Sequence, residues 1–244
     1  MAGEMILITG ANGGIGQYVA RYLLSHGERN IVLHYRSGND KVLHLLKEFD
    51  LDPKAHAVQA DLLDEVAVTR IADELKERFG GVDRLVNVAG SSSNSMSWKL
   101  PTAEFVRILN DNLLTAFICC KAFMPGMRES GFGRIINFSS IVGSTGMPGA
   151  AHYAAAKAGL GGLTKSLALE LASKGITVNA VALGYFNAGL IETVPLDLRE
   201  DIKGRIPMRR FGEEQDVGAL VAYLLSRDAG FLTGQVLHVN GGQF

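Results

Sequence analysis

Short apolar runs alternate with longer amphipathic segments along the chain. Seven runs have the length and continuous hydrophobicity of strands buried on both faces, and they lie at residues 5–9, 30–34, 54–59, 84–88, 133–138, 176–181 and 236–239. The segments between them place apolar residues at helical spacing, which predicts helices at residues 15–26, 41–49, 63–79, 102–127, 150–173 and 213–225. This alternation predicts βαβ units and an α/β fold, in which a mostly parallel, doubly wound sheet carries helices on both faces.

The pattern continues without a linker or a block of like charges. The chain has 244 residues, which is enough for one sizeable core, so residues 1–244 are expected to form a single domain. One long stretch, residues 184–208, shows no regular pattern and follows the end of a predicted strand. Open α/β sheets bind ligands at that edge, so this stretch is interpreted as a substrate lid that orders over bound ligand.

Composition narrows the class of protein. The formal net charge of −1 provides no general attraction for nucleic acid or for an anionic membrane. Cys119 and Cys120 are the only cysteines, and adjacent residues on a helix point about 100° apart, so no disulfide is expected. No signal peptide precedes the first apolar run, and no stretch approaches the roughly 20 apolar residues of a membrane span. A cytoplasmic protein without a metal site is therefore expected.

A glycine-rich turn links the first predicted strand to the first helix. In the segment from Thr9 to Gly16, Gly10 permits a tight turn, Gly14 lets the backbone approach a pyrophosphate, and Gly16 lets the helix pack closely on the strand. The helix N-terminus offers free N–H groups to phosphates. The alternative is a glycine-rich turn without a ligand, but its place at the start of a βαβ unit favours a Rossmann-like dinucleotide site.

The end of the second strand bears on the choice of cofactor. A carboxylate at this position would bind the ribose 2′-hydroxyl of NAD. The chain instead has His34, Tyr35, Arg36 and Ser37, with no acidic residue before Asp40. An arginine binds a 2′-phosphate through charge-assisted bonds, whereas a carboxylate repels it. NADP(H) is therefore predicted, against the alternative of a solvated loop arginine.

Tyr153 and Lys157 lie four residues apart in a predicted helix, which places them one turn apart on the same face. Free tyrosine has a pKa near about 10, and an adjacent ammonium would lower it and make the phenol a better proton donor to a developing alkoxide. By itself this pair is also compatible with an exposed helix face.

Together these motifs resemble the short-chain dehydrogenase/reductase superfamily, and the resemblance covers essentially the whole chain. It implies that Tyr153 transfers the proton, Lys157 lowers the tyrosine pKa and holds the nicotinamide ribose, Ser140 polarises the substrate oxygen, and Asn112 completes a proton relay. It also implies a set of cofactor-binding residues, namely Gly10, Asn12, Gly13, Gly14, Ile15, Gly16, Arg36, Ser37, Asp61, Leu62, Asn87, Ala89, Gly90, Tyr153, Lys157, Gly184 and Phe186.

The chain departs from the family pattern at three places. Val88 replaces an asparagine after the fourth strand, and a modest effect is expected. After the sixth strand Leu183 replaces a proline and Ala188 replaces a threonine, so a hydroxyl contact to the cofactor is missing unless Asn187 supplies it. Gly13 stands where many NADP-binding relatives have a basic residue.

Within the superfamily the chain is most similar to 3-oxoacyl-acyl-carrier-protein reductases, which implies NADPH-dependent reduction of a 3-oxoacyl thioester and an acyl carrier protein as partner. Reductases of acetoacetyl-CoA, polyketides, sugars or steroids share much of the pattern, so these substrates stay open. A dinucleotide-binding sensor without activity is a further alternative, disfavoured because Tyr153 and Lys157 are both intact.

Other side chains carry weaker signals. An apolar substrate cleft is predicted from Met96, Trp98, Met147, Tyr185, Phe186 and Leu190, for which core or lid packing is an equal alternative. Lys174, Arg128 and Arg134 are either docking charges for an acidic carrier protein or solvated surface charges. The helices at 102–127 and 150–173 are apolar on more than one face, as at Leu113, Ala116, Phe117, Leu163, Leu167 and Leu171. This pattern predicts a homotetramer.

Overall fold

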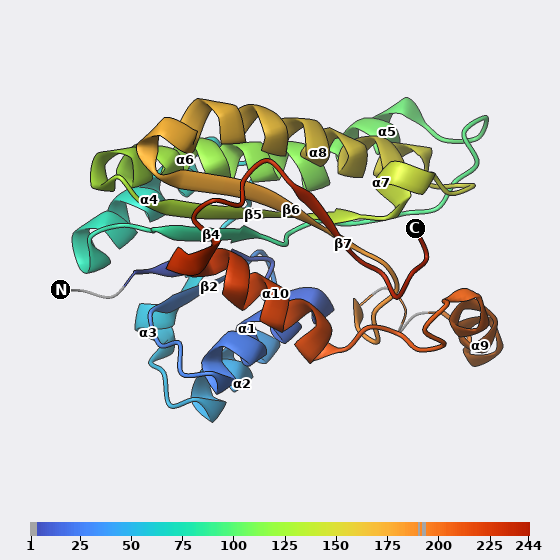
Figure 1. The fold of residues 1–244 in the computed structure, drawn as a ribbon, viewed down its shortest axis with the longest axis horizontal. Coiled ribbons are helices and arrows are strands. Elements are labelled where there is room, and N and C mark those ends of the chain that lie inside the picture. Colours follow the sequence, from blue (N-terminus) through green and yellow to red (C-terminus); the bar gives the residue numbers. More distant parts are fainter. Residues whose placement is uncertain (1–3, 190, 192–193) are drawn as a thin grey trace.

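A parallel sheet forms the middle layer of the protein (Figure 1). The computed structural model describes residues 4–189, 191 and 194–244, so Leu190 of the predicted cleft lies outside them. The sheet has seven strands in the order β3-β2-β1-β4-β5-β6-β7, and every neighbouring pair is parallel. The strands are β1 (Ile6–Thr9), β2 (Ile31–Tyr35), β3 (Ala57–Gln59), β4 (Arg84–Asn87), β5 (Gly133–Ser140), β6 (Ile176–Leu183) and β7 (Val236–Val239). The predicted doubly wound α/β fold is confirmed.

Helices cover both faces of the sheet and bury two apolar clusters against it. One face carries α4 (Glu65–Phe79), α6 (Thr115–Ser130) and α8 (Ala151–Leu171), and the other carries α1 (Gly14–Ser25), α2 (Asp40–Glu48) and α10 (Glu214–Leu225) (Figure 1). Alternate residues of each strand point to opposite faces, so Leu7 belongs to the first cluster while Ile6 and Ile8 belong to the second. The continuous apolar runs in the sequence reflect this burial on both sides.

The helix predicted at residues 102–127 is interrupted. It consists of α5 (Thr102–Leu109), a π-helical turn η1 (Asn110–Leu114) and α6. A π turn adds a residue to the helical repeat and is frequent at functional sites. Here it contains Asn112, whose side chain is buried.

Short helices were also missed. Pro53 begins α3 (Pro53–His56), and the Asp52 side chain accepts a hydrogen bond from the backbone N–H of Lys54, so the first half of the predicted strand 54–59 is helical. After β5 lies α7 (Val142–Thr145). Smaller 3₁₀ turns are η2 (Ala172–Lys174) and η4 (Arg227–Ala229).

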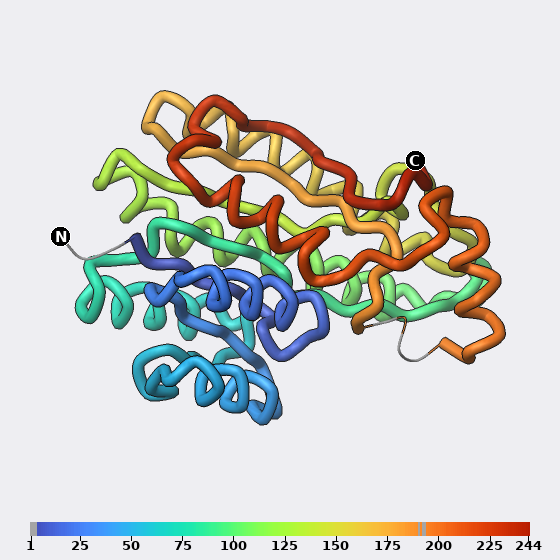
Figure 2. The backbone as a smooth tube through the Cα atoms, turned by 60° about the horizontal axis from the view of Figure 1, so that its bottom comes forward, coloured from blue at the N-terminus to red at the C-terminus, as the bar shows by residue number. Residues whose placement is uncertain are grey.

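The predicted lid is more regular than the sequence indicated. It contains α9 (Leu196–Arg205), so the description of residues 184–208 as irregular is wrong for that part. The segment is also bonded to the body of the domain, because the N–H of Asn187 donates to the carbonyl of Gly212 at 2.9 Å and that of Met208 to Gly241 at 3.1 Å. Two views place α9 and the C-terminus at the same end of the molecule, far from the N-terminus (Figures 1 and 2).

The strand order reverses direction between β1 and β4. From β1 the chain builds outward first to β2 and β3, and then on the other side to β4, β5, β6 and β7. The loops that leave β1 and β4 therefore separate at the carboxyl edge, which is where open α/β sheets bind ligands. The glycine-rich turn and the loop after β4 both lie at this point.

Candidate active site

The three residues predicted to act on the substrate oxygen come from two neighbouring elements. Tyr153 and Lys157 lie in the first two turns of α8, with the Lys157 ammonium 5.5 Å from the centre of the Tyr153 ring. Ser140 ends β5, the strand against which α8 packs, and its hydroxyl acts on the Tyr153 phenol to lower the pKa of that phenol. The Lys157 side chain is 6% exposed, and its ammonium donates to the carbonyl of Phe138 at 2.8 Å. The structure therefore brings Ser140, Tyr153 and Lys157 together.

Burial controls the charge of this pair. Desolvation lowers the pKa of Lys157 to about 8. Desolvation also raises the pKa of Tyr153, and the hydrogen bond with Ser140 only partly opposes this effect. The expected lowering by the ammonium does not set the direction in the free protein, where Lys157 donates to the carbonyl of Phe138 and the pKa of Tyr153 is raised. A phenol that keeps its proton at neutral pH suits a general acid in ketone reduction.

Asn112 lies next to this pair on the π-helical turn. Its amide nitrogen donates to the carbonyls of Ser91 at 2.8 Å and Ile108 at 2.9 Å, while its buried Oδ1 has no partner among the described residues. A Cβ atom built on Gly90 would lie 2.4 Å from this oxygen and 3.6 Å from the Lys157 ammonium, so only glycine fits there. The structure thus places Asn112, Gly90 and Lys157 around one point.

The glycine-rich turn is tightly packed against the loop that follows β4. Gly10 has a φ of +64°, and a Cβ there would lie 2.7 Å from the Cα of Ala89. The backbone N–H groups of Val88 and Ala89 donate to the Thr9 hydroxyl at 3.1 and 3.2 Å, which joins the ends of β1 and β4. Helix α1 begins after Gly13 with no side-chain cap and no acidic residue in its first turn, so its N-terminal N–H groups face the carboxyl edge.

Two predicted cofactor residues use their side chains elsewhere. The Asn87 amide donates to Asn137 at 3.0 Å within the core, on the side of the sheet covered by α6 and α8. The Phe186 ring is 4% exposed and packs on Gly212, where a Cβ would lie 2.7 Å from the ring. These residues hold the strands and the segment after β6 in place, so a direct contact with a cofactor would come from their backbone.

The residues predicted to bind the adenosine half of the dinucleotide are exposed at the surface. Arg36 and Ser37 are exposed just beyond β2, and the carbonyl of Arg36 accepts a hydrogen bond from Gln59 at 3.0 Å. Asp61 is exposed after β3, where its carboxylate accepts the N–H of Leu63 at 3.0 Å. These positions suit recognition of a ribose phosphate and an adenine edge, respectively.

The segment after β6 packs directly on the glycine-rich turn. A Cβ on Gly14 would lie 2.4 Å from the nitrogen of Gly189 and 3.0 Å from the Cβ of Ala188. Asn187 points away from this contact, because its amide donates to Glu213 at 3.2 Å. In this arrangement Asn187 does not replace the missing threonine hydroxyl, and Gly14 is required by the close approach of residues 188–189.

Apolar side chains gather around the mouth of the site. Met96, Trp98 and Met147 are 44%, 78% and 38% exposed. They lie in two loops joined by a hydrogen bond from the N–H of Ser95 to the carbonyl of Gly149 at 2.9 Å. These three side chains are thus exposed and available to a ligand, so the cleft stays a prediction for them, whereas Phe186 belongs to the core.

A polar network beside the catalytic helix was not predicted. The Ser93 hydroxyl donates to Glu104 at 2.5 Å and contacts Nε2 of His152 at 2.9 Å, and Arg107 binds both carboxylate oxygens of Glu104. His152 is fully buried and immediately precedes Tyr153. Sequence gives no sign of this network, because its members meet only when the loop after β4 lies between α5 and α8.

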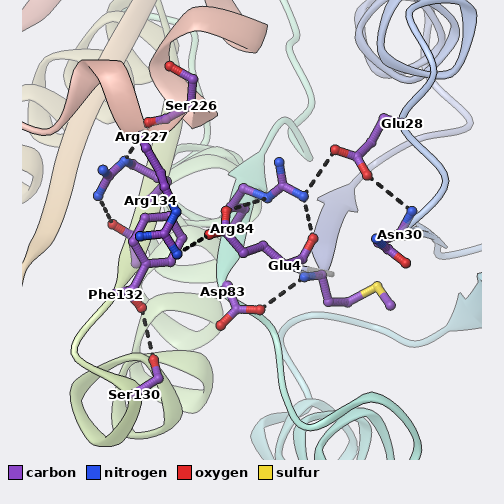
Figure 3. Close-up of polar contacts among 12 residues, drawn as sticks. Glu4, Glu28, Asn30, Asp83, Arg84, Ser130, Phe132, Arg134, Ser226 and Arg227 are labelled. Atoms are coloured by element: carbon purple, nitrogen blue, oxygen red, sulfur yellow. Dashed lines mark hydrogen bonds and ion pairs between the residues drawn. The ribbon is translucent and has the colours of Figure 1, made fainter. Parts of the chain in front are cut away.

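The basic residues considered for carrier docking lie at the opposite, amino edge of the sheet. Arg134 is 4% exposed; its guanidinium donates to the carbonyls of Ser226 at 3.0 Å and Gly133 at 2.9 Å and lies over the Phe132 ring (Figure 3). Arg134 is therefore a structural residue and not a solvated docking charge. Lys174, in η2, and Arg128, in the last turn of α6, remain at the surface of that edge.

The described residues contain neither a membrane-spanning helix nor a candidate metal cluster. No helix among them is long and apolar enough to cross a membrane. In the same part of the chain, no group of three or more histidine, cysteine, aspartate or glutamate side chains is placed to hold a metal ion.

Comparison with known proteins agrees with this geometry. A family described as enoyl-(acyl carrier protein) reductase matches residues 10–243. The 3-oxoacyl-[acyl-carrier-protein] reductase of Staphylococcus epidermidis is 39% identical over 98% of both chains, and that of Haemophilus influenzae is 37% identical over 100% of this chain and 99% of its own. A solved structure assigned as a short-chain alcohol dehydrogenase from Sinorhizobium meliloti has a TM-score of 0.89 at 33% identity, covering 100% of this chain and 97% of its own.

The parallel sheet, the glycine-rich turn at its switch point and the serine, tyrosine and lysine beside it define a nicotinamide-dependent oxidoreductase. The chain belongs to the short-chain dehydrogenase/reductase family. It is similar over its whole length to 3-oxoacyl-acyl-carrier-protein reductases.

Proposed function

We propose that the protein reduces a 3-oxoacyl thioester to the 3-hydroxyacyl thioester with NADPH, the acyl group being presented on an acyl carrier protein. The observation that carries the proposal is the convergence of Ser140, Tyr153 and Lys157 beside the glycine-rich turn, at the edge where apolar Met96, Trp98 and Met147 are exposed. The names of the two curated relatives support the substrate class.

The residues present fit a dinucleotide. The uncapped N-terminus of α1 suits the pyrophosphate, Lys157 would bond the nicotinamide ribose, and Asp61 would bond the adenine edge. The unpaired Oδ1 of Asn112 beside Lys157 is a buried acceptor that a proton relay would use. When bound, the nicotinamide supplies the hydride.

The protein's own groups then manage the substrate oxygen. The Ser140 hydroxyl hydrogen-bonds the ketone oxygen and polarises it, and the Tyr153 phenol, which burial keeps protonated, donates its proton to the developing alkoxide. Lys157 stabilises the resulting phenolate, and a proton passed through the Asn112 turn restores the phenol. The exposed apolar side chains at the mouth exclude water from the acyl chain.

The NADP preference rests on the end of β2. Arg36 is exposed there and no carboxylate lies between it and Asp40, so a 2′-phosphate meets a cation without a competing anion. Gly13 has no charged side chain, so Arg36 is the residue that would bind the 2′-phosphate without help from a basic residue in the glycine-rich turn.

The test is a substrate panel run with both cofactors. Loss of NADPH absorbance is followed with a 3-oxoacyl carrier-protein thioester, acetoacetyl-CoA, a keto-sugar and a keto-steroid, and Tyr153→Phe is the matched control because it removes only the phenolic oxygen. We expect the highest kcat/KM with the carrier-bound thioester and NADPH, and less than about 1% of kcat in Tyr153→Phe, since general acid catalysis contributes about 10²–10⁴-fold.

Other outcomes replace the proposal with a named alternative. A higher kcat/KM with a sugar or a steroid assigns that substrate class instead. Binding of dinucleotide without turnover of any ketone in the panel supports the sensor. Equal activity of wild type and Tyr153→Phe refutes the catalytic assignment.

A further inference from the structure

His34 is a buried histidine at the carboxyl end of β2. Its side chain is 3% exposed, and both ring nitrogens are bonded to backbone groups of the loops that follow other strands. Nδ1 accepts the N–H of Gly10 at 3.2 Å, and Nε2 lies 3.1 Å from the carbonyl oxygen of Ala60. One imidazole therefore joins the turn after β1 to the loop after β3.

These partners fix the tautomer. An N–H group can only donate, so Nδ1 opposite Gly10 must be a bare acceptor, and a carbonyl can only accept, so Nε2 opposite Ala60 must carry the proton. A second proton on Nδ1 would face the N–H of Gly10 and break that bond. Burial lowers the pKa of His34 to about 4, and this effect outweighs the bond to the Ala60 carbonyl and the charge of Asp61, which both act to raise it.

The bonded groups belong to the dinucleotide site. Gly10 is the first glycine of the turn and holds a φ of +64°, and Ala60 immediately precedes Asp61. Backbone bonds follow the same path, because the N–H of Ala11 donates to the carbonyl of His34 at 2.8 Å. The ring thus spans the ends of three strands directly behind the residues predicted to hold the adenosine.

We propose that His34 is a positioning residue for the dinucleotide: its neutral Nε2–H imidazole sets the spacing between the glycine-rich turn and the loop that begins at Asp61. The inference rests on the proposed function, since it requires that a dinucleotide binds there. It is independent of the 2′-phosphate, because His34 contacts backbone groups shared by both cofactors. Arg36, by contrast, acts on NADPH alone.

The first test measures cofactor affinity in three variants at pH 7. His34→Leu removes both bonds, His34→Asn keeps an acceptor and a donor without a titratable ring, and His56→Gln is the matched control. His56 bonds the carbonyl of Ile31 at 2.7 Å and so touches the same strand at its opposite end. Dissociation constants for NADPH and NADH are measured by fluorescence titration, with kcat at saturating cofactor.

We expect His34→Leu to raise both dissociation constants about tenfold, by the same factor, because the buried N–H of Gly10 loses its acceptor. The value of kcat should stay within about twofold of wild type, His34→Asn should recover most of the affinity, and His56→Gln should leave both constants unchanged. Unchanged affinity in His34→Leu overturns the proposal, as does a tenfold loss for NADPH alone. If wild type binds neither dinucleotide, the proposed function fails together with this inference. This outcome is seen in the wild-type protein itself, so it is distinct from any effect of the variants.

A measurement on the wild-type protein covers the case in which His34→Leu does not fold. The ¹⁵N shifts of selectively labelled histidine report which ring nitrogen carries the proton. We expect His34 to be the neutral Nε2–H form at pH 7 and its shifts to move when NADPH is added. A protonated Nδ1, or shifts that stay fixed on saturation with NADPH, would contradict the proposal.

Discussion

The active-site lysine should cost the free protein stability, and removing it should make the fold more stable. Lys157 is buried, and its ammonium has a carbonyl partner but no carboxylate within the described residues. Its pKa falls from 10.5 to about 8 because burial penalises the charged form. A shift of ~2.5 units corresponds to roughly 3 kcal/mol, at 1.36 kcal/mol per unit.

The sign follows from which state binds the proton more tightly. Between pH 10.5 and about 8 the unfolded chain holds a proton on Lys157 that the folded protein releases, so this group lowers stability as the pH falls through that range. Below about pH 8 the full cost is present. Lys157→Met keeps the length of the side chain and removes the charge, but it also removes the hydrogen bond to the Phe138 carbonyl, worth about 1 kcal/mol. The expected net gain at pH 7 is about 1–2 kcal/mol.

The assay is urea unfolding of wild type and Lys157→Met at pH 7 and again at pH 9.5, at one protein concentration. We expect Lys157→Met to be the more stable protein at pH 7, to lose much of that advantage at pH 9.5, and to have no measurable turnover. Equal stability at both pH values, or an advantage that does not depend on pH, would show that the ammonium is solvated in the free protein and that burial does not set its pKa.

Three further predictions concern the cofactor, the lid and the assembly. Arg36→Asp should weaken NADPH binding at least tenfold more than NADH binding in paired titrations, and a wild-type preference for NADH in kcat/KM would refute the cofactor assignment. Ala188→Thr should tighten NADPH by a few-fold to about tenfold if the added hydroxyl gains one hydrogen bond, whereas weaker binding would show that the packing on Gly14 leaves no room. The protein should be a homotetramer by light scattering at micromolar concentration, since apolar Phe117 on α6 and Leu169 on α8 are 42% and 85% exposed, and a monomer would contradict this.

The strands were the most predictable part of the fold. Burial on both faces makes each strand a continuous apolar run, so the predicted bounds lie within two residues of the observed ones except at β3. Helix α9 escaped prediction because it buries none of its residues and Leu196 and Leu198 are exposed, so its sequence carries no apolar stripe. The π turn at Asn112 was hidden because residues 110–114 contain no glycine or proline that would mark an interruption of the helix.

The candidate site was predictable in its residues but not in its electrostatics. Spacing along α8 places Tyr153 and Lys157 on one face, and this is geometry that sequence contains. The pKa of the phenol depends on what surrounds it, and the bond from Lys157 to the Phe138 carbonyl joins residues nineteen positions apart in the chain. The same limit applies to His34, whose neighbours Gly10 and Ala60 meet it only through the order of the strands.

The two edges of the sheet differ in how well their polar groups are satisfied. At the amino edge Arg134 and Arg227 stack on Phe132 and bond to carbonyls or to Glu4 (Figure 3). At the carboxyl edge several buried polar atoms have no hydrogen-bond partner among the described residues, and they belong to Asn12, Asn87, Asn112, His152 and Gln243, whereas at the amino edge the Nε of Arg84 is the one such atom. Each such atom costs stability in the free protein, about 1–3 kcal/mol where no hydrogen bond forms. Because most of the atoms at the carboxyl edge flank the proposed cofactor and relay positions, ligand binding can offset a cost that the fold alone leaves in place.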